Sequence, residues 1–194
     1  ATYLFPDAQW YISETKDETT FAAKAGNNGE PHNHNDVGSF ELFRRGTVLL
    51  HDLGSGEYNK DYFSPKRYEF FCCSSRGHSV PIVNGTYQAE GTEHAATDVI
   101  LREDGMCADI AGAYDEPTLR SLVRDFRFDR TEGSLRLTDT YRFDKTPSSV
   151  TERFITPAEP VIGGDGTVTI RSESETLTVT YDADALTPKV QSET

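Results

Sequence analysis

Short runs of alternating apolar and polar residues follow one another along the chain, and none keeps the spacing of an amphipathic helix. Examples are Leu135–Thr138 ("LRLT") and Thr167–Ile170 ("TVTI"), in which every second side chain is apolar. Such alternation is typical of strands with one buried face. Turn-forming pairs such as Asn84-Gly85 and Asp104-Gly105 lie between the runs. The pattern predicts an all-β fold: a large antiparallel β-sandwich of the supersandwich type, with two stacked sheets and about 12 strands.

One segment breaks the regular spacing of these runs. Residues 54–71 form a long stretch rich in glycine, tyrosine and basic side chains. Because binding residues often lie in long loops on a rigid sandwich, this segment is a candidate binding loop. The other turns are short, and we find no internal repeat or linker. We therefore expect residues 1–194 to form a single β-sandwich domain.

The composition excludes several classes of protein. The chain is 36% apolar and 26% charged, as soluble globular proteins are. No apolar run approaches the roughly 20 residues that span a bilayer, so we expect no membrane partner. The net charge of −13 argues against nucleic acid. Residues 42–78 nevertheless hold six basic and four acidic side chains, a local surplus that suits either an anionic ligand or scattered solvated charges.

The three cysteines, Cys72, Cys73 and Cys107, cannot all pair with one another, and two of them are adjacent. Adjacent cysteines rarely form a disulfide, and the CxxC spacing of a thiolate zinc site is missing. We expect reduced structural thiols. The chain starts with Ala1 and shows no basic-then-apolar leader, so we expect a processed or excised part of a longer protein.

The stretch "EPHNHND" contains two histidines, His32 and His34, separated by one residue. On a β-strand both would face the same side and could begin a metal site. Asp52 follows the apolar run "TVLLH", where a carboxylate needs a partner, and His78 precedes another apolar run. One carboxylate with imidazoles suits zinc with an open fourth position, while an ordinary hydrogen-bonded polar cluster is the alternative. Other candidate ligands are Asp36, His51, which should face the opposite side of its strand, and His94, which should lie in a polar turn.

The segments "NNGEPHNHNDVGSFELFRRGTVLLHDLGSGEY" and "YFSPKRYEFFCCSSRGHSVPIVNGTYQ" closely resemble the heparinase II/III-like polysaccharide lyases. The resemblance is strong over about residues 20–90 and weaker through "LRLTDTYRFD" and "TERFITP". It implies an enzyme with an N-terminal helical toroid and a C-terminal β-sandwich, of which this chain would be the sandwich alone. It also implies a zinc ion that is bound by His34, Asp52 and His78. An ion that pins the strands of these three residues together would be largely structural in role. His32 would face the substrate cleft as a catalytic residue.

Members of this family cleave uronate-containing glycans, either heparin- or heparan-like or alginate-like, by β-elimination. The reaction needs a group that neutralises the uronate carboxylate and groups that move protons. The resemblance implies that the main catalytic tyrosine, with a histidine and an asparagine, comes from the helical domain. An isolated sandwich should therefore be inactive. A loop tyrosine can also enter the cleft, and we expect Tyr62, with Tyr58 and Tyr68 as alternatives. The candidate substrate-binding residues are Asn33, Tyr58, Arg67 and Arg76.

The expected partners are an acidic polysaccharide or oligosaccharide and the helical domain of the same parent chain. Resemblance favours a secreted or periplasmic location, and a cytoplasmic one stays open. One alternative function is a non-catalytic carbohydrate-binding or structural β-sandwich. Another is a metal-dependent hydrolase or cupin-like enzyme, in which the substrate would reach the metal.

Overall fold

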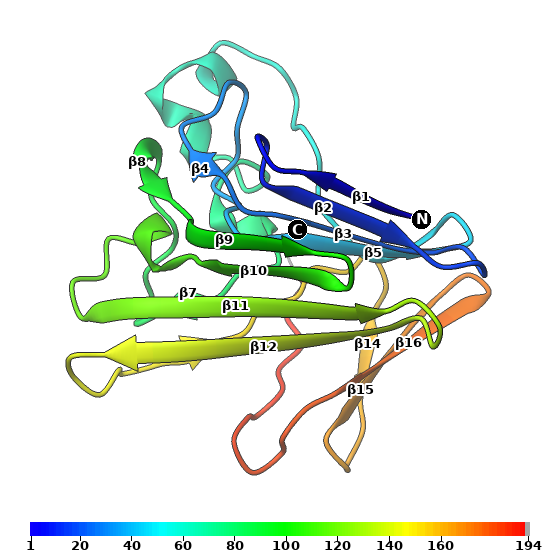
Figure 1. Cartoon of the computed structure of the whole chain (residues 1–194). Helices are drawn as coiled ribbons and strands as arrows, with labels where there is room; N and C mark the ends of the chain where they lie inside the picture. Colours follow the sequence, from blue (N-terminus) through cyan, green and yellow to red (C-terminus); the bar gives the residue numbers. More distant parts are fainter. Residues whose placement is uncertain (193–194) are drawn as a thin grey trace.

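The computed structural model describes residues 1–192, which contain strands and short 3-10 helices but no α-helix. Two large antiparallel sheets dominate the fold (Figure 1). The first has the order β1-β2-β3-β5-β6, and the second has the order β12-β11-β10-β9. The strands of the first sheet are β1 (Thr2–Phe5), β2 (Trp10–Glu14), β3 (Thr19–Lys24), β5 (Phe40–Arg44) and β6 (Thr47–Leu50). Those of the second are β9 (Thr97–Arg102), β10 (Gly105–Asp109), β11 (Leu119–Asp129) and β12 (Ser134–Phe143).

Three smaller sheets complete the structure. A C-terminal sheet has the order β14-β15-β16, and two pairs, β4 with β8 and β7 with β13, lie within the connecting segments. Their strands are β4 (Asn27–Asn28), β7 (Ile82–Val83), β8 (Gly91–Ala95), β13 (Val150–Thr151), β14 (Pro160–Ile162), β15 (Thr167–Ser172) and β16 (Glu175–Thr180). The predicted all-β antiparallel sandwich is confirmed. The strands in residues 1–192 outnumber the expected 12 because several are too short to show alternation.

The core lies between the two large sheets, where alternating side chains of both meet. Tyr11, Phe21 and Phe40 come from the first sheet, and Phe126 and Phe128 come from β11. The ring centroid of Phe21 lies 5.4 Å from that of Phe126 and 5.5 Å from that of Phe128. These tilted contacts lie within the centroid separation of about 4.5–7 Å at which aromatic pairs attract each other. Burial of every second residue therefore fixes the register of the strands against each other.

The long loop between β6 and β7 contains three 3-10 helices, η1 (Asp61–Phe63), η2 (Pro65–Glu69) and η3 (Ser75–Gly77). A fourth, η4 (Ala111–Ala113), follows β10. In Figure 1 the long loop, in cyan to green, rises above one end of the sandwich beside β4 and β8. The predicted loop is therefore present, and most of it is ordered into short helical turns.

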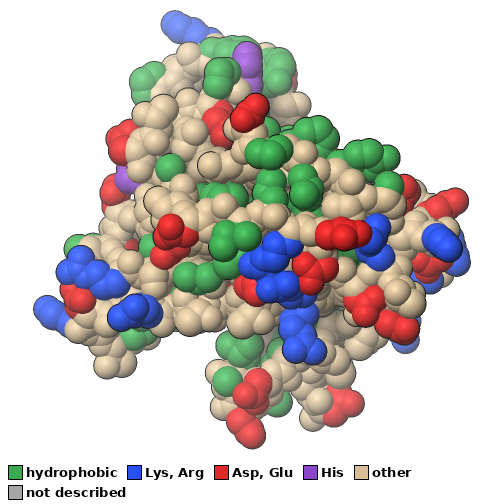
Figure 2. All heavy atoms as spheres, viewed as in Figure 1, with side chains coloured by type: hydrophobic (Ala, Val, Ile, Leu, Met, Phe, Trp, Pro, Cys, Tyr) green, Lys and Arg blue, Asp and Glu red, His purple; other side chains and the backbone are tan. Residues whose placement is uncertain are grey.

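The outer surface of the first sheet is apolar near its N-terminal hairpin. Tyr3, Phe5 and Trp10 are each about half exposed, and Figure 2 shows hydrophobic side chains gathered over this hairpin. Within residues 1–192, no helix is long and apolar enough to cross a membrane.

Candidate metal centre

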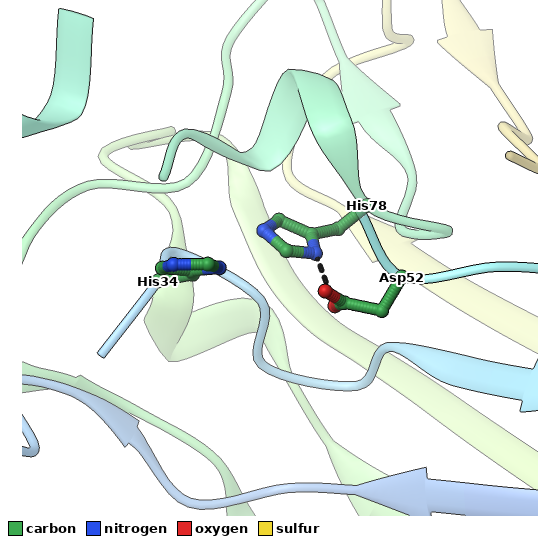
Figure 3. A group of neighbouring side chains, drawn as sticks. All are labelled: His34, Asp52 and His78. Carbon is green, nitrogen blue, oxygen red and sulfur yellow. Dashed lines mark hydrogen bonds and ion pairs between the residues drawn. The ribbon is translucent and has the colours of Figure 1, made fainter. Parts of the chain in front are cut away.

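Three segments that are far apart in sequence converge beside the long loop. His34 precedes β5, Asp52 follows β6, and His78 follows η3. One potential ligand atom from each residue lies within 4.8 Å of the other two. Figure 3 shows the three side chains gathered around a common point. The structure therefore brings together the three residues that the sequence resemblance implied as zinc ligands.

Strand β6 positions Asp52 at the edge of the core. Leu49 and Leu50 are buried, so the end of the strand is anchored two residues before the carboxylate. Asp52 Oδ1 accepts a hydrogen bond from the backbone N–H of Gly54 at 2.8 Å. This local bond turns the chain away from the sheet and leaves Oδ2 directed at His78.

The ring of His78 is fully buried between two oxygen atoms. Its Nε2 lies 2.9 Å from the carbonyl oxygen of Cys72, and its Nδ1 lies 2.7 Å from Asp52 Oδ2. A carbonyl oxygen can only accept, so Nε2 carries a hydrogen and donates it. In a neutral ring Nδ1 would then present a lone pair to a carboxylate. Two acceptors at that distance need either a proton or a cation between them.

Electrostatics in the metal-free site favour a proton at this position. Burial opposes the charged form of His78, but the hydrogen bond and charge of Asp52 outweigh it and raise the pKa of the imidazole. Burial would raise the pKa of Asp52, but the hydrogen bond and charge of His78 lower it instead. For His34, burial and then the nearby His78 lower the pKa, so that this ring is neutral and can act as a ligand.

These contacts fit a zinc ion. Two imidazoles and one carboxylate are typical zinc ligands. A histidine that binds metal through one nitrogen usually donates its other N–H to a carbonyl or carboxylate, as His78 Nε2 does to Cys72. A divalent cation would also replace the proton that the His78–Asp52 contact requires. The donor set alone does not select zinc over other divalent metals.

His34 packs against the rings of two neighbours. Its centroid lies 5.3 Å from that of His78, and its Nε2 lies 3.3 Å from the hydroxyl of Tyr62. Tyr62 is only 1% exposed, and burial raises its pKa to about 12, so it is a neutral phenol at physiological pH. Tyr62, which we expected to enter the cleft, therefore lies beneath the loop surface and contacts a candidate ligand.

His32 and His34 do not lie on a β-strand, so the expectation that they project together is wrong. Residues 31–32 form a turn, closed by the N–H of Asn33 donating to Glu30 O at 3.1 Å. His32 has a φ of 60°, in the left-handed region, which no strand can accommodate. His32 is exposed and His34 is half-buried. The turn therefore separates an outward-facing histidine from an inward-facing one.

Most of the expected substrate-binding residues make internal hydrogen bonds. Asn33 is buried, and its side chain donates to His34 O and accepts from the Tyr68 hydroxyl. Arg67 donates to backbone carbonyls of the His32–Asn33 turn. The half-buried Arg76 donates to Ser74 Oγ and Glu69 O. Among the four expected contact residues, Tyr58 is the largely exposed one, at 60%.

Phe63 is a candidate contact residue that sequence reasoning missed. It is 62% exposed, and its ring centroid lies 5.4 Å from that of Tyr58. Both rings rest near buried Tyr62, at 5.7 Å and 4.8 Å respectively. An aromatic residue in a loop full of aromatics offers no sequence signal that separates an exposed ring from a buried one. The structure thus adds an exposed aromatic pair next to the candidate metal centre.

Buried Arg124 connects the site to the second sheet, and sequence reasoning also missed this residue. It is 1% exposed, and its Nη1 donates to Gly38 O at 3.0 Å and to Ser79 O at 2.8 Å. Its Nε and Nη2 bind the carboxylate of Asp139, and Nη2 also reaches Glu152 Oε2 at 3.2 Å. One guanidinium therefore ties both histidine-bearing segments to the second sheet. The alternation of Arg124 with Leu122 and Phe126 could have revealed its inward position.

The other candidate ligands lie elsewhere. Asp36 forms an ion pair with Lys24, with Oδ1 2.8 Å from Nζ. His51 is half-buried and stands outside the three-residue cluster. His94 was expected in a polar turn but lies in β8, because residues 91–95 pair with β4. Its Nε2 is 3.7 Å from Asp115 Oδ1.

Two comparisons with known proteins find matches to this chain. The chain matches the family described as "Heparinase II/III-like, C-terminal" over residues 2–185. Similar solved structures include a heparinase III (18% identity, TM-score 0.66, 89% of this chain and 26% of that chain). Another is the heparan sulfate lyase HepC from Pedobacter heparinus (20% identity, TM-score 0.64, 87% of this chain and 26% of that chain). No curated protein matches the chain.

The two kinds of match carry different weight. At these identities the solved structures establish a shared fold, and the chain spans about a quarter of their length. The family match covers nearly the whole chain and confirms the resemblance that was drawn from the histidine and "HSVPIVNG" motifs. The chain therefore belongs to the heparinase II/III-like C-terminal family.

Proposed function

We propose that this chain is the zinc-binding β-sandwich of a lyase that cleaves uronate-containing acidic polysaccharides by β-elimination. His34, Asp52 and His78 would hold the zinc ion. The observation that carries the proposal is the contact between His78 Nδ1 and Asp52 Oδ2 at 2.7 Å, with Nε2 committed to the Cys72 carbonyl. The lone pairs of His78 Nδ1 and Asp52 Oδ2 need a positive charge between them, and the His34 imidazole offers a third lone pair nearby. Such a site is suited to a divalent cation.

The zinc ion would supply structural cross-linking and charge neutralisation. The three segments that meet at the site are far apart in the sequence, and a common metal would hold them together. The buried position of His78 and the Tyr62 ring beside His34 support this structural role over direct contact with a substrate. The hydrolase or cupin-like alternative requires an open metal, and this packing argues against it.

His32 is the residue that we propose for chemistry. It is exposed, and it lies two residues from His34. An imidazole there can donate to the uronate carboxylate, on which charge develops when the neighbouring proton is removed, or can itself transfer a proton. Arg76 is a weaker candidate for a sulfate or carboxylate group, because two of its nitrogen atoms already donate to the protein.

The remaining catalytic groups would come from a helical domain of the parent chain. The solved structures that share this fold are about four times longer than the part that this chain matches. The main catalytic tyrosine, with a histidine and an asparagine, would lie in that domain. We therefore propose that the sandwich alone binds glycan but does not cleave it.

The exposed rings of Tyr58 and Phe63 favour a second candidate function, glycan binding without chemistry. Aromatic faces carry negative quadrupole charge that attracts the C–H groups of a sugar ring. Two adjacent exposed rings beside a locally basic loop would suit an acidic oligosaccharide. Phe63→Ala should then weaken binding while changing the free energy of unfolding by less than about 0.5 kcal/mol.

An assay with defined glycans separates the two functions. Heparin, heparan sulfate and alginate oligosaccharides are incubated with the chain, alone and together with the helical part of the parent protein. Unsaturated uronate product is followed by ultraviolet absorbance. We expect product only when both parts are present, and its loss in His32→Ala. Binding without product in the presence of both parts would favour the non-catalytic function, and product from the chain alone would contradict our proposal.

A further inference from the structure

Arg67, in η2 of the long loop, turns its guanidinium toward the protein. Nε and Nη2 donate to the carbonyl oxygen of Asn33 at 3.0 Å and 2.8 Å. Nη2 also donates to His32 O at 2.9 Å, and Nη1 donates to Tyr62 O at 3.2 Å. One side chain therefore binds three carbonyl oxygens from two separate segments. This use of the donors leaves little capacity for a sulfate or carboxylate ligand.

The same guanidinium stacks on the ring that touches His34. Its central carbon lies 4.3 Å from the centroid of Tyr62, close enough for a cation–π contact. The Tyr62 hydroxyl in turn lies 3.3 Å from His34 Nε2. Arg67 thus contacts both the backbone that leads into His34 and the phenol whose hydroxyl lies within hydrogen-bond distance of the His34 imidazole.

The backbone that Arg67 binds is strained. His32 has a φ of 60°, which non-glycine residues adopt only where their surroundings hold them. The hydrogen bonds to His32 O and Asn33 O hold the two successive peptides that follow His32 and lead into His34. Tyr68, one residue further along η2, adds a bond from its hydroxyl to Asn33 Oδ1 at 3.0 Å. The turn that separates outward His32 from inward His34 is therefore held from η2.

We propose that Arg67 is a positioning residue for the candidate metal centre. Its planar fork holds the His32–Asn33 turn and the Tyr62 ring, so that His34 faces Asp52 and His78 while His32 faces solvent. Lysine cannot replace it, because a single ammonium group cannot reach three carbonyls and stack on the ring. This inference rests on the proposed metal function, but the hydrogen bonds themselves exist without a metal.

The test compares Arg67→Ala and Arg67→Lys with the matched control Lys66→Ala, whose side chain is 62% exposed. Circular dichroism confirms that each variant folds. Zinc affinity is measured by chelator competition, and Co²⁺ in place of zinc reports ligand geometry through its visible absorption. Hydrogen exchange of the His34 and Asn35 amides is measured in the metal-free protein.

We expect both Arg67 variants to bind zinc about 10–100-fold more weakly, as is typical when a group that orients a ligand is lost. Their cobalt spectra should change and their amides should exchange faster, whereas Lys66→Ala should match the wild type. Wild-type affinity and spectra in both variants, or full rescue by lysine, would overturn the inference. If the wild type binds no metal, the proposed metal function fails, and hydrogen exchange alone tests the role of Arg67. Faster exchange of the His34 and Asn35 amides in both variants would then support the positioning role, and unchanged exchange would refute it.

Discussion

The sandwich core and the candidate metal centre are held together by different forces. In the core, alternating apolar side chains from two sheets pack face to face, as Phe21 does with Phe126 and Phe128. Around the metal centre, side chains bind backbone carbonyls: His78 at Cys72, and Arg67 at His32 and Asn33. Burial of apolar area supplies the larger free energy, and directional hydrogen bonds supply the exact placement of ligands. Stability and site geometry should therefore respond to different substitutions.

The largest effect should come from Arg124, where the two regions meet. Arg124→Leu leaves the carboxylates of Asp139 and Glu152 without their buried partner and two carbonyls without a donor. Removing one member of a buried ion pair costs about 3–5 kcal/mol, and we expect a loss at the upper end of that range. Zinc affinity should fall as well. Urea unfolding and chelator competition measure the two effects.

Arg136→Leu, on the exposed face of neighbouring β12, is the matched control and should change stability by less than about 0.5 kcal/mol. If Arg124→Leu does not fold, Arg124→Lys retains the charge and provides a milder test. Unchanged zinc affinity in a folded Arg124 variant would show that the core and the metal centre are uncoupled.

Phe126→Ala should affect the core alone. Phe126 is 1% exposed and contacts both Phe21 and Phe40, so its removal leaves a cavity. Such substitutions cost about 3–5 kcal/mol. Zinc stoichiometry of the folded protein should stay unchanged, because the ring packs on Phe21, Phe40 and the Arg124 guanidinium rather than on the candidate ligands. Loss of metal binding at temperatures where circular dichroism shows a folded protein would contradict the separation of the two regions.

A smaller, pH-dependent effect should come from Glu152. Burial and the neighbouring Asp139 raise its pKa to about 7 from the ordinary value of 4.5, against the attraction of Arg124. The folded protein thus keeps a proton that the unfolded chain loses. The stabilisation from this proton is complete below pH 4.5 and is lost as pH rises toward 7. Tyr141 also donates to this carboxylate.

Glu152→Gln should flatten the pH dependence of the melting temperature between pH 4.5 and 7 and raise that temperature at pH 8. Thermal unfolding in a pH series measures both. Glu132→Gln, in an exposed turn, is the matched control and should leave the pH profile of the melting temperature unchanged. An identical pH profile in Glu152→Gln and the wild type would rule out this proton.

The same division explains what could be predicted from the sequence. Alternation of apolar and polar residues predicted the long strands, because burial of every second side chain requires an apolar residue at every second position. Strands of two residues, such as β4, β7 and β13, depend on tertiary pairing and leave no such pattern. The residues alone left His34, Asp52 and His78 as three among several candidates, and only the resemblance singled them out.

The errors also lie where local hydrogen bonds decide the structure. The turn at His32 depends on Glu30, Asn33 and Arg67, a set that no periodicity rule connects. Tyr62 and Phe63 are adjacent aromatic residues, yet Tyr62 is buried and Phe63 is 62% exposed. Arg124 is the opposite case, because its place among inward-facing positions of β11 was readable.

Metal content tests the central claim most directly. The purified chain is stripped of metal, incubated with Zn²⁺, freed of excess zinc and analysed by inductively coupled plasma mass spectrometry. Asp52→Asn is treated in the same way, and Asp61→Asn, whose carboxylate is exposed, is the control. We predict one zinc ion per chain in the wild type and in Asp61→Asn, and a strongly reduced content in Asp52→Asn. Equal zinc content in Asp52→Asn and the wild type, or none in the wild type, would contradict the proposed centre of His34, Asp52 and His78.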